Sequence, residues 1–499
     1  MNSGAGFHAL QQSADCASPY PQAGTESTHC EGEGVMEYES FIRRKLSCVP
    51  PTGITGELRI PLSLFDHQRA LVQWALRRGR AAIFADTGLG KSRMQLAWAS
   101  EVLRHTGRPV LILAPLAVAP QTVAEGAEIG VTVAHVREQS QIGEVGIYIT
   151  NYDRMHLFEP AAFGALVLDE SSCIKHHTAK TFAHLCEAFE RTPYKLCATA
   201  TPAPNDWTEL GTHAEFLGIC TRAEMLAEYF VHDGAETQVW RLKGHARAQF
   251  WRWVSTWGAM VRKPSDLGFD DSRYELPSLT VHQHTVMIPD AAQRMGMLIA
   301  MEAQTLSERR NARKESVADR VKACADLVNA DDERWLVWCD LNAESDALTR
   351  AIRGAVEVKG ADDPDHKESA MLDFAAGRIR VLVSKPSIAG WGMNFQVCAR
   401  MAFVGVTDSW ESYYQAVRRC WRFGQRRPVD VHVFASDLEG SVVANLRRKE
   451  ADALAMADAL SAETRESVMR EVRGLVRQTN NYNATRTLSV PAWLRSEVA

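Results

Sequence analysis

The stretch that decides the fold reads Ala85-Asp86-Thr87-Gly88-Leu89-Gly90-Lys91-Ser92. It lies between an apolar run at residues 81–84 and a segment of helical character at residues 93–98, so it forms a turn from a strand into a helix. The glycines allow backbone N–H groups to curl inward, and the following helix directs the positive end of its dipole to the same point. These features predict a loop that binds a triphosphate through residues 86–92. Lys91 is expected to contact the β- and γ-phosphates and Ser92 to hold Mg²⁺.

Length and composition favour an enzyme of several folded units. The chain has 499 residues, and a usual domain size of ~150 residues suggests about three units. The net charge of -5 means that any nucleic-acid site must be a local basic groove on an acidic protein. No long apolar run predicts a membrane span, and the N-terminus lacks the features of a secretory signal. The 11 cysteines are scattered and never in C-x-x-C spacing, which indicates neither a disulfide framework nor a zinc site and favours a reducing cytoplasm.

Composition and periodicity divide the chain into five parts. Residues 1–55 have the composition of a poorly ordered leader. Strands and helices alternate in residues 56–225 and again in residues 331–440, which predicts two lobes built on parallel sheets. Between the lobes we expect a helical insertion or connector at residues 226–330, and after them a helical extension and tail at residues 441–499.

An acidic pair follows a buried strand of the first lobe. The apolar run at residues 165–168 leads directly into Asp169 and Glu170. The carboxyl ends of parallel strands form one edge of a sheet, where the chemistry of such folds is located. Asp169 is therefore expected to hold Mg²⁺, and Glu170 to orient and deprotonate the attacking water. Together with the phosphate loop, this pair predicts ATP hydrolysis.

Two stretches near these strands resemble the motifs of a known family. Residues 169–175 carry Asp-Glu followed shortly by Ile-Lys, and a later stretch reads Ala198-Thr199-Ala200-Thr201-Pro202-Ala203-Pro204-Asn205. They are similar to motifs II and III of the SWI/SNF-type ATPases within superfamily two of the helicases, with Ala200 in place of a family glycine. Ser171 and Ser172 replace the Ala-Asp of DEAD-box RNA helicases, which argues against that branch. Gln68 resembles the adenine-reading glutamine of superfamily two, because its amide can both donate to and accept from the adenine edge.

The second lobe carries two further matches to the same family. Motif V is matched at Gly390, Gly392 and Asn394, and motif VI at Gln415, Ala416, Arg419, Arg422, Gly424 and Gln425. Arginines three residues apart lie on one face of a helix, so Arg419 and Arg422 can both point at a γ-phosphate during its transfer. The resemblance implies that Gly390 and Gln415 also bind the nucleotide. It implies nucleic-acid contacts at Pro115, Asn151, Tyr152, Ser387 and Asn394.

A stripe of apolar and aromatic residues lies within the expected insertion. Its members recur at i, i+3, i+4, i+7 and i+11 and are Phe250, Trp253, Val254, Trp257 and Val261. The favoured interpretation is a helix face that packs the insertion onto the first lobe. Arginines among these residues leave open an alternative, an aromatic and basic surface that stacks on a nucleic-acid strand.

The expected fold is α/β, with two RecA-like parallel-sheet lobes, a helical insertion, and a helical C-terminal extension that braces the second lobe. ATP and Mg²⁺ are expected between the lobes. The first lobe binds the phosphates and the second supplies the arginines, so hydrolysis is expected to be coupled to opening and closing of the cleft.

The resemblance implies a double-stranded-DNA translocase of the SWI/SNF type, similar to the stand-alone ATPases of bacteria and their viruses. It would act in the cytoplasm of a bacterium or of a virus-infected host cell. Two alternatives remain open: a strand-separating helicase of replication or recombination, and an ATP-switched DNA-binding or loading protein that does not translocate. No targeting module is visible, so a separate protein partner could supply targeting, and no membrane contact is expected.

Overall fold

The computed structural model describes residues 52–115, 118–233, 236–287, 311, 313–389, 394–405, 407–437 and 440–473. The leader expected at residues 1–55 lies almost wholly outside these ranges, as does the tail after residue 473. Two glycines of motif V, Gly390 and Gly392, also lie outside them, so the expected contact of Gly390 with the nucleotide stays a prediction.

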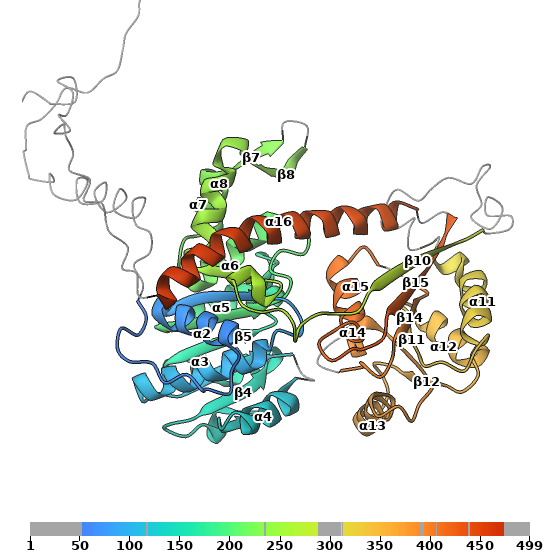
Figure 1. Ribbon diagram of the computed structural model, residues 1–499, viewed down its shortest axis with the longest axis horizontal. Helices are drawn as coiled ribbons and strands as arrows, with labels where there is room; N and C mark the ends of the chain where they lie inside the picture. Colours follow the sequence, from blue (N-terminus) through green and yellow to red (C-terminus); the bar gives the residue numbers. More distant parts are fainter. Residues whose placement is uncertain are drawn as a thin grey trace, which may run out of the picture. The chain divides into compact units, whose positions relative to one another are not determined.

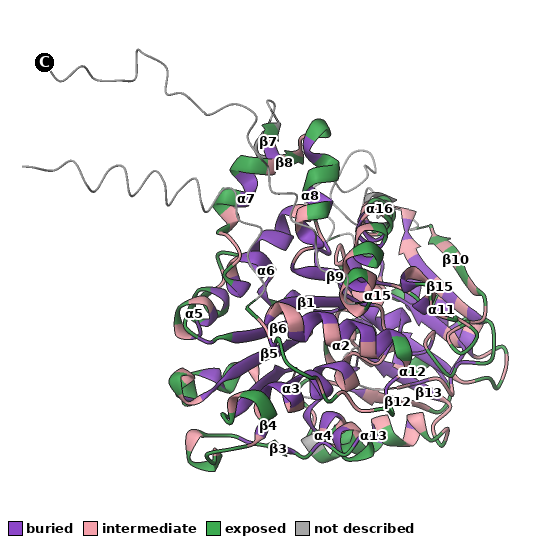
Figure 2. Ribbon diagram, turned by 60° about the vertical axis from the view of Figure 1, so that its left-hand side comes forward, coloured by how far each residue is buried: buried purple, intermediate pink, exposed green. Residues whose placement is uncertain are grey.

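The first lobe is built on a seven-stranded parallel sheet in the order β3-β4-β2-β5-β6-β1-β9 (Figure 1). Its strands are β1 (Arg80–Ala85), β2 (Val110–Ala114), β3 (Val133–His135), β4 (Ile147–Asn151), β5 (Ala165–Asp169), β6 (Tyr194–Thr199) and β9 (Gly258–Val261). The central strands are apolar and buried along almost their whole length, since helices cover both faces. Figure 2 shows these strands as a purple layer beneath the helices.

Two apolar cores lie on opposite faces of this sheet. On one face are α2 (Asp66–Arg78), α3 (Lys91–Thr106) and α4 (Ala119–Glu128). On the other are α5 (Lys180–Ala188) and α6 (Leu210–Leu217). Strand β1 alternates between the two cores residue by residue, as the pleat requires. All strands of the sheet end at the same edge, and this places the phosphate loop after β1 beside the acidic pair after β5.

The second lobe is built on a six-stranded parallel sheet in the order β10-β15-β14-β11-β13-β12. Its strands are β10 (Leu279–Val286), β11 (Trp335–Trp338), β12 (Ala355–Val358), β13 (Val381–Ser384), β14 (Arg400–Phe403) and β15 (Val429–Ser436). The helices around it are α11 (Val317–Val328), α12 (Asn342–Ala351), α13 (Pro364–Ala375), α14 (Pro386–Ala389) and α15 (Trp410–Val417). The two sheets with their helices confirm the α/β class with two RecA-like lobes.

The segment expected as a helical insertion contains strands as well as helices. After α7 (Arg222–Tyr229) it forms an antiparallel hairpin from β7 (Phe230–Asp233) and β8 (Glu236–Leu242). Strand β9 then joins the first sheet beside β1, and β10 joins the second beside β15. Local periodicity does not show which distant strand a short segment pairs with. The sequence therefore indicated only helices in this segment.

The aromatic stripe of this segment is mostly buried. Helix α8 (Arg247–Val254) carries Phe250 and Val254, and the stripe continues past the helix end through Trp257 into β9 at Val261. These four side chains are at most 1% exposed and belong to the cores of the first lobe. The packing interpretation is therefore confirmed for them, although the stripe runs over a helix and a strand instead of one helix.

The C-terminal helix α16 (Gly440–Val472) packs on both lobes, so the expectation that it braces the second lobe is incomplete. Its Leu446 belongs to a core of the second lobe, whereas Met456 and Leu460 belong to a core of the first. Near its end, Thr464 Oγ1 accepts a hydrogen bond from the backbone N–H of Met260 at 2.9 Å. A helix of 33 residues is about 50 Å long, which is sufficient to reach across both sheets (Figure 1). Among the described residues, no helix combines the length and apolar character needed to span a membrane.

Candidate active site

The phosphate loop lies between the end of β1 at Ala85 and the start of α3 at Lys91. Gly88 and Gly90 have φ angles of 92° and 79°, in the left-handed region that favours glycine. A Cβ atom added to Gly90 would lie 2.4 Å from Nε2 of Gln68, so a side chain would also be too close there. Lys91 Nζ donates to the carbonyl oxygen of Ala85 at 3.0 Å, which closes the loop on itself.

The Gln68 side chain is hydrogen-bonded to the backbone of the phosphate loop. Its Nε2 donates to the carbonyl oxygen of Leu89 at 2.9 Å, and its Oε1 accepts from the backbone N–H of Phe65 at 3.0 Å. Both ends of the amide therefore have protein partners, and the side chain is buried. Recognition of adenine by Gln68 stays a prediction, whereas its contact with the loop backbone is a feature of the fold.

The acidic pair is held in a strained and hydrogen-bonded arrangement. Among the described residues, Glu170 is the one non-glycine residue with a positive φ, at 50°, a conformation that costs roughly 1–3 kcal/mol. Its carboxylate accepts a hydrogen bond from Thr199 Oγ1 at 3.2 Å, and Asp169 Oδ1 accepts one from Gln95 Nε2 at 2.5 Å. Burial, reinforced by the charge of Glu170, raises the pKa of Asp169 to about 6. Desolvation lowers the pKa of Lys91, and the charge of Glu170 opposes that shift.

The two expected arginines follow the end of α15 at Val417, so they lie in turns and not on one helix face as expected, and both line the cavity that contains this pair. Arg419 donates from Nε to the carbonyl oxygen of Gln415 at 3.3 Å and from Nη2 to its Oε1 at 3.1 Å, so Gln415 positions the guanidinium. Burial lowers the pKa of Arg419, and attraction to Glu170 opposes that shift. Arg422 has a buried Nε with no hydrogen-bond partner among the described residues. Desolvation, followed by repulsion from the neighbouring arginines, lowers its pKa to about 10.

These groups line one cavity of about 420 Å³. Its walls come from both lobes and include Gln68, Thr87, Gly88, Gly90, Lys91, Ser92, Asp169, Glu170, Arg419 and Arg422. The structure thus brings together most of the residues expected to bind nucleotide. The buried donor of Arg422 and the cradle around Gly90 fit an anionic phosphate ligand.

Three aromatic residues that the sequence did not single out also line this cavity. The ring of Tyr274 lies edge-on to that of Phe65, with centroids 5.8 Å apart, and 5.2 Å from the ring of Phe423. All three line the cavity and offer flat apolar faces on which a nucleobase can stack. Tyr274 precedes β10 in a connecting segment without a motif, so an isolated aromatic residue was the single available signal.

Three residues expected to contact nucleic acid line a second cavity of about 310 Å³ at the strand ends. They are Pro115, Asn151 and Tyr152. The Asn151 side chain accepts from the backbone N–H of Arg154 at 3.1 Å, and the Tyr152 hydroxyl donates to the carbonyl oxygen of Asp169 at 2.7 Å. Tyr152 therefore also fixes the end of β5, which no sequence pattern indicated.

The other two residues expected to contact nucleic acid lie elsewhere. Ser387 lines a cavity of about 80 Å³ at the strand ends of the second lobe, beside Lys385. Asn394 lines the nucleotide cavity instead, and its Oδ1 is buried without a hydrogen-bond partner among the described residues. The structure thus distributes the five residues expected to contact nucleic acid over three separate cavities.

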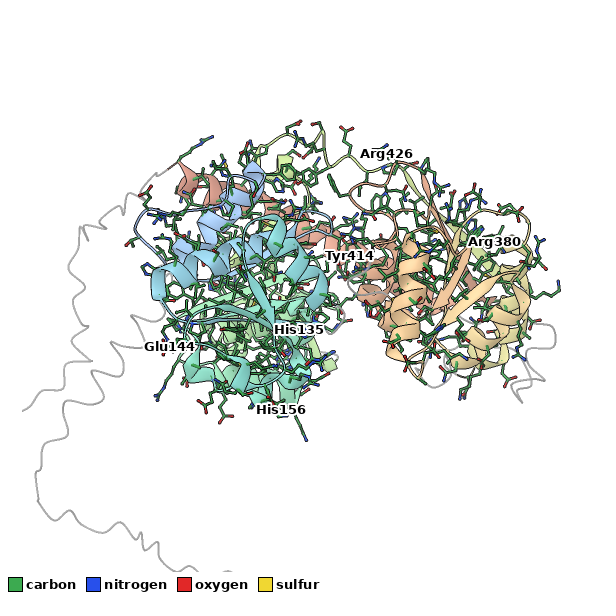
Figure 3. The ribbon with its side chains drawn as sticks, turned by 90° about the horizontal axis from the view of Figure 1, so that it is seen from below. His135, Glu144, His156, Arg380, Tyr414 and Arg426 are labelled. Carbon is green, nitrogen blue, oxygen red and sulfur yellow. The ribbon has the colours of Figure 1, made fainter. Side chains whose placement is uncertain are left out.

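Contacts between the lobes form a group that sequence reasoning missed. Lys175 Nζ of the first lobe pairs with a carboxylate oxygen of Glu411 on α15, whose other oxygen accepts from Thr201 Oγ1 at 3.2 Å. Tyr414 and Arg418 of the second lobe contact the phosphate loop itself, and Figure 3 labels Tyr414 beside the first lobe. The partners of these residues are distant in sequence, so local patterns carried no signal for them.

Two family models match this chain, and together they cover more than half of it. One is the SNF2-related domain, at residues 67–244, and the other is the helicase conserved C-terminal domain, at residues 319–424. The chain therefore belongs to the superfamily-two helicase-like ATPases of the SWI/SNF type. It is a hydrolase of ATP, as the phosphate loop and the acidic pair predicted.

Relatives of known name share smaller parts of the sequence. The bifunctional helicase and thymine dioxygenase JBP2 of Leishmania braziliensis is 26% identical over 139 residues, which is 26% of this chain and 12% of that protein. This chain thus spans a small part of the length of that relative. The Sulfolobus solfataricus SWI2/SNF2 ATPase core, solved in complex with dsDNA, has a TM-score of 0.39 and 17% identity, covering 84% of this chain and 97% of that chain.

Proposed function

We propose that this ATPase moves along duplex DNA, with the strand ends of both sheets in contact with the DNA backbone. The cavity at the strand ends shares Glu170 with the nucleotide cavity and is also lined by Glu411 of the second lobe. A change at the phosphates therefore acts on a surface to which both lobes contribute.

The residues of the nucleotide cavity have distinct roles in this proposal. Lys91 binds the β- and γ-phosphates, and Glu170 takes a proton from the attacking water. Arg419 and Arg422 stabilise the negative charge that spreads over the transferred phosphoryl group. Ser92 and Asp169 supply oxygens of the kind that Mg²⁺ prefers, and the ion would neutralise phosphate charge when bound.

Coupling to movement follows from the division of these roles between the lobes. ATP satisfies groups on both lobes and favours their closure, whereas phosphate release removes that link. If each lobe binds the DNA backbone, alternate closing and opening of the cleft moves the DNA contacts of one lobe relative to those of the other. Contacts with phosphates alone predict little dependence on base sequence and a stimulation by DNA that falls steeply with salt.

Strand separation is the second candidate function, and the β7–β8 hairpin favours it. This antiparallel hairpin extends from the first lobe, and its His232 and Trp240 rings lie tilted by 37° with their centroids 3.6 Å apart. In this alternative, the aromatic pair holds two separated strands apart. A translocase that leaves the duplex intact avoids the cost of ~1.4 kcal/mol per base-pair step that such an element must overcome.

Two assays on the full chain distinguish these functions. We expect duplex DNA to stimulate ATP hydrolysis and the enzyme to displace the third strand of a triplex while leaving a forked duplex paired. Glu170→Gln is the control, since it keeps ATP binding and removes hydrolysis. Fork unwinding at a similar ATP cost that is lost on shortening the β7–β8 hairpin would establish the helicase instead. Stimulation by DNA without either activity would leave an ATP-switched binding protein.

A further inference from the structure

One arginine next to the expected pair is directed at the protein and away from the substrate. Arg418 Nη2 lies 2.6 Å from Asp86 Oδ2 and donates to the carbonyl oxygen of Thr87 at 2.9 Å, and its Nε donates to Thr87 Oγ1. Asp86 and Thr87 belong to the phosphate loop of the first lobe, whereas Arg418 directly follows α15 of the second. The pair is therefore a bridge between the lobes at the loop that holds the phosphates.

The surroundings of Arg418 fix this geometry. The guanidinium lies over the ring of Trp421 at 4.9 Å and over that of Tyr414 at 5.7 Å. The Tyr414 hydroxyl donates to Asp86 Oδ1, so both oxygens of this carboxylate are held by the second lobe. The Arg418 side chain is 4% exposed, in contrast to Arg427, whose pair with Glu333 has both partners more than 40% exposed. The contact at Asp86 is thus poorly screened by solvent.

Arg418 and Arg419 are adjacent in the chain but line different cavities. Arg419 lines the nucleotide cavity with Arg422, while Arg418 lines a separate cavity of about 610 Å³ on the other side of the loop. Thr87 lines both cavities, so the loop is the wall between them. A shift of Arg418 relative to Thr87 would also move Arg419, because the two residues are adjacent in the chain.

We propose that Arg418, assisted by Tyr414, is a positioning residue that docks the second lobe on the phosphate loop and so places Arg419 and Arg422 for hydrolysis. Its charge has a second effect, because it neutralises the Asp86 carboxylate beside a triphosphate of the same sign. Arg418 itself touches neither the nucleotide cavity nor the water-activating Glu170. The known reaction therefore depends on an arginine outside the matched motif positions.

The two effects separate in a double-variant experiment on ATP turnover. Arg418→Gln loses a charge-assisted contact, so we expect kcat to fall by about tenfold or more and KM for ATP to rise by about tenfold. Adding Asp86→Asn removes the unpaired carboxylate, which should return KM to within about threefold of wild type. The double variant should keep the low kcat, because docking is still lost. Tyr414→Phe should lower kcat in the same direction by less.

A control variant, stability measurements and binding measurements accompany the kinetic experiment. Arg427→Gln removes an exposed arginine pair of the same lobe and should leave kcat and KM unchanged. Unfolding temperatures of all variants, and binding of a fluorescent ATP analogue at equilibrium, separate folding and affinity from turnover. An unchanged or higher kcat in Arg418→Gln would overturn the proposal. Recovery of kcat in the double variant would do so as well, because charge neutralisation would then explain the whole effect.

Discussion

The two walls of the nucleotide cavity differ in how their charged side chains are satisfied. On the first lobe, Lys91, Asp169 and Glu170 each have a hydrogen-bond partner within the protein. On the second lobe, Arg419 donates to Gln415, but the Nε of Arg422 is buried without a partner among the described residues. The first wall is thus arranged before the substrate binds, whereas the second holds a positive charge that an anionic ligand can satisfy.

This difference has a thermodynamic reason. A buried donor without a partner costs free energy in the free enzyme, so Arg422 favours any state in which a phosphate oxygen is near it. The hydrogen-bonded groups of the first lobe provide no comparable drive. ATP can therefore draw the second lobe towards the first, which gives the substrate itself a part in closing the site.

The largest effect is expected from removing the unsatisfied charge. Arg422→Ala should lower turnover by ~10³ or more, as for arginine fingers, and change ATP affinity much less. Arg422→Lys should not restore turnover, since an ammonium group lacks the planar fork of donors. Steady-state kinetics and equilibrium binding of an ATP analogue measure the two quantities.

The unfolding temperature of Arg422→Ala tests whether this arginine also supports the fold. Because the Arg422 Nε has no partner to lose, Arg422→Ala should leave the unfolding temperature of the free enzyme close to that of wild type. A large drop, or full turnover in either Arg422 variant, would mean that this arginine supports the fold and does not complete the site.

A smaller effect is expected from removing the hydrogen bond that Thr199 donates to Glu170 on the first lobe. Thr199→Val keeps the shape of the side chain and removes the hydroxyl that donates to Glu170 at 3.2 Å. A hydrogen bond to a charged group contributes about 1.5–3 kcal/mol, so turnover should fall by roughly tenfold or more if the bond orients the base. Thr199→Ser is the matched control, because it retains the hydroxyl and should keep most of the activity. Equal turnover in the two variants would show that Glu170 is oriented by its backbone alone.

The sequence predicted the residues whose role depends on local pattern. Lys91 and Ser92 follow from a loop between a strand and a helix, and Glu170 from its place after an apolar strand, because parallel strands bring these ends together. It did not predict Arg418 as a contact of Asp86, since the partner lies 332 residues earlier and one more arginine in a basic stretch has no distinct signal. The joining of β9 and β10 to different sheets was hidden for the same reason, because their partners are set by tertiary pairing.

The smallest effect concerns how closely the phosphate loop packs on Gln68. An alanine in the left-handed region costs about 1–2 kcal/mol, which applies both to Gly90, with φ 79°, and to Gly107 at the other end of α3, with φ 64°. A Cβ at Gly107 meets nothing within 4 Å, whereas one at Gly90 would lie 2.4 Å from Gln68 Nε2. Gly107→Ala should therefore lower the free energy of unfolding by the backbone cost alone and leave ATP affinity unchanged.

Gly90→Ala should lower the free energy of unfolding further and weaken ATP binding, because the loop must move away from Gln68. Denaturant unfolding and ATP-analogue binding of the two variants, measured side by side, give the difference. Equal losses of stability and equal affinities would mean that Gln68 yields freely and does not support the loop.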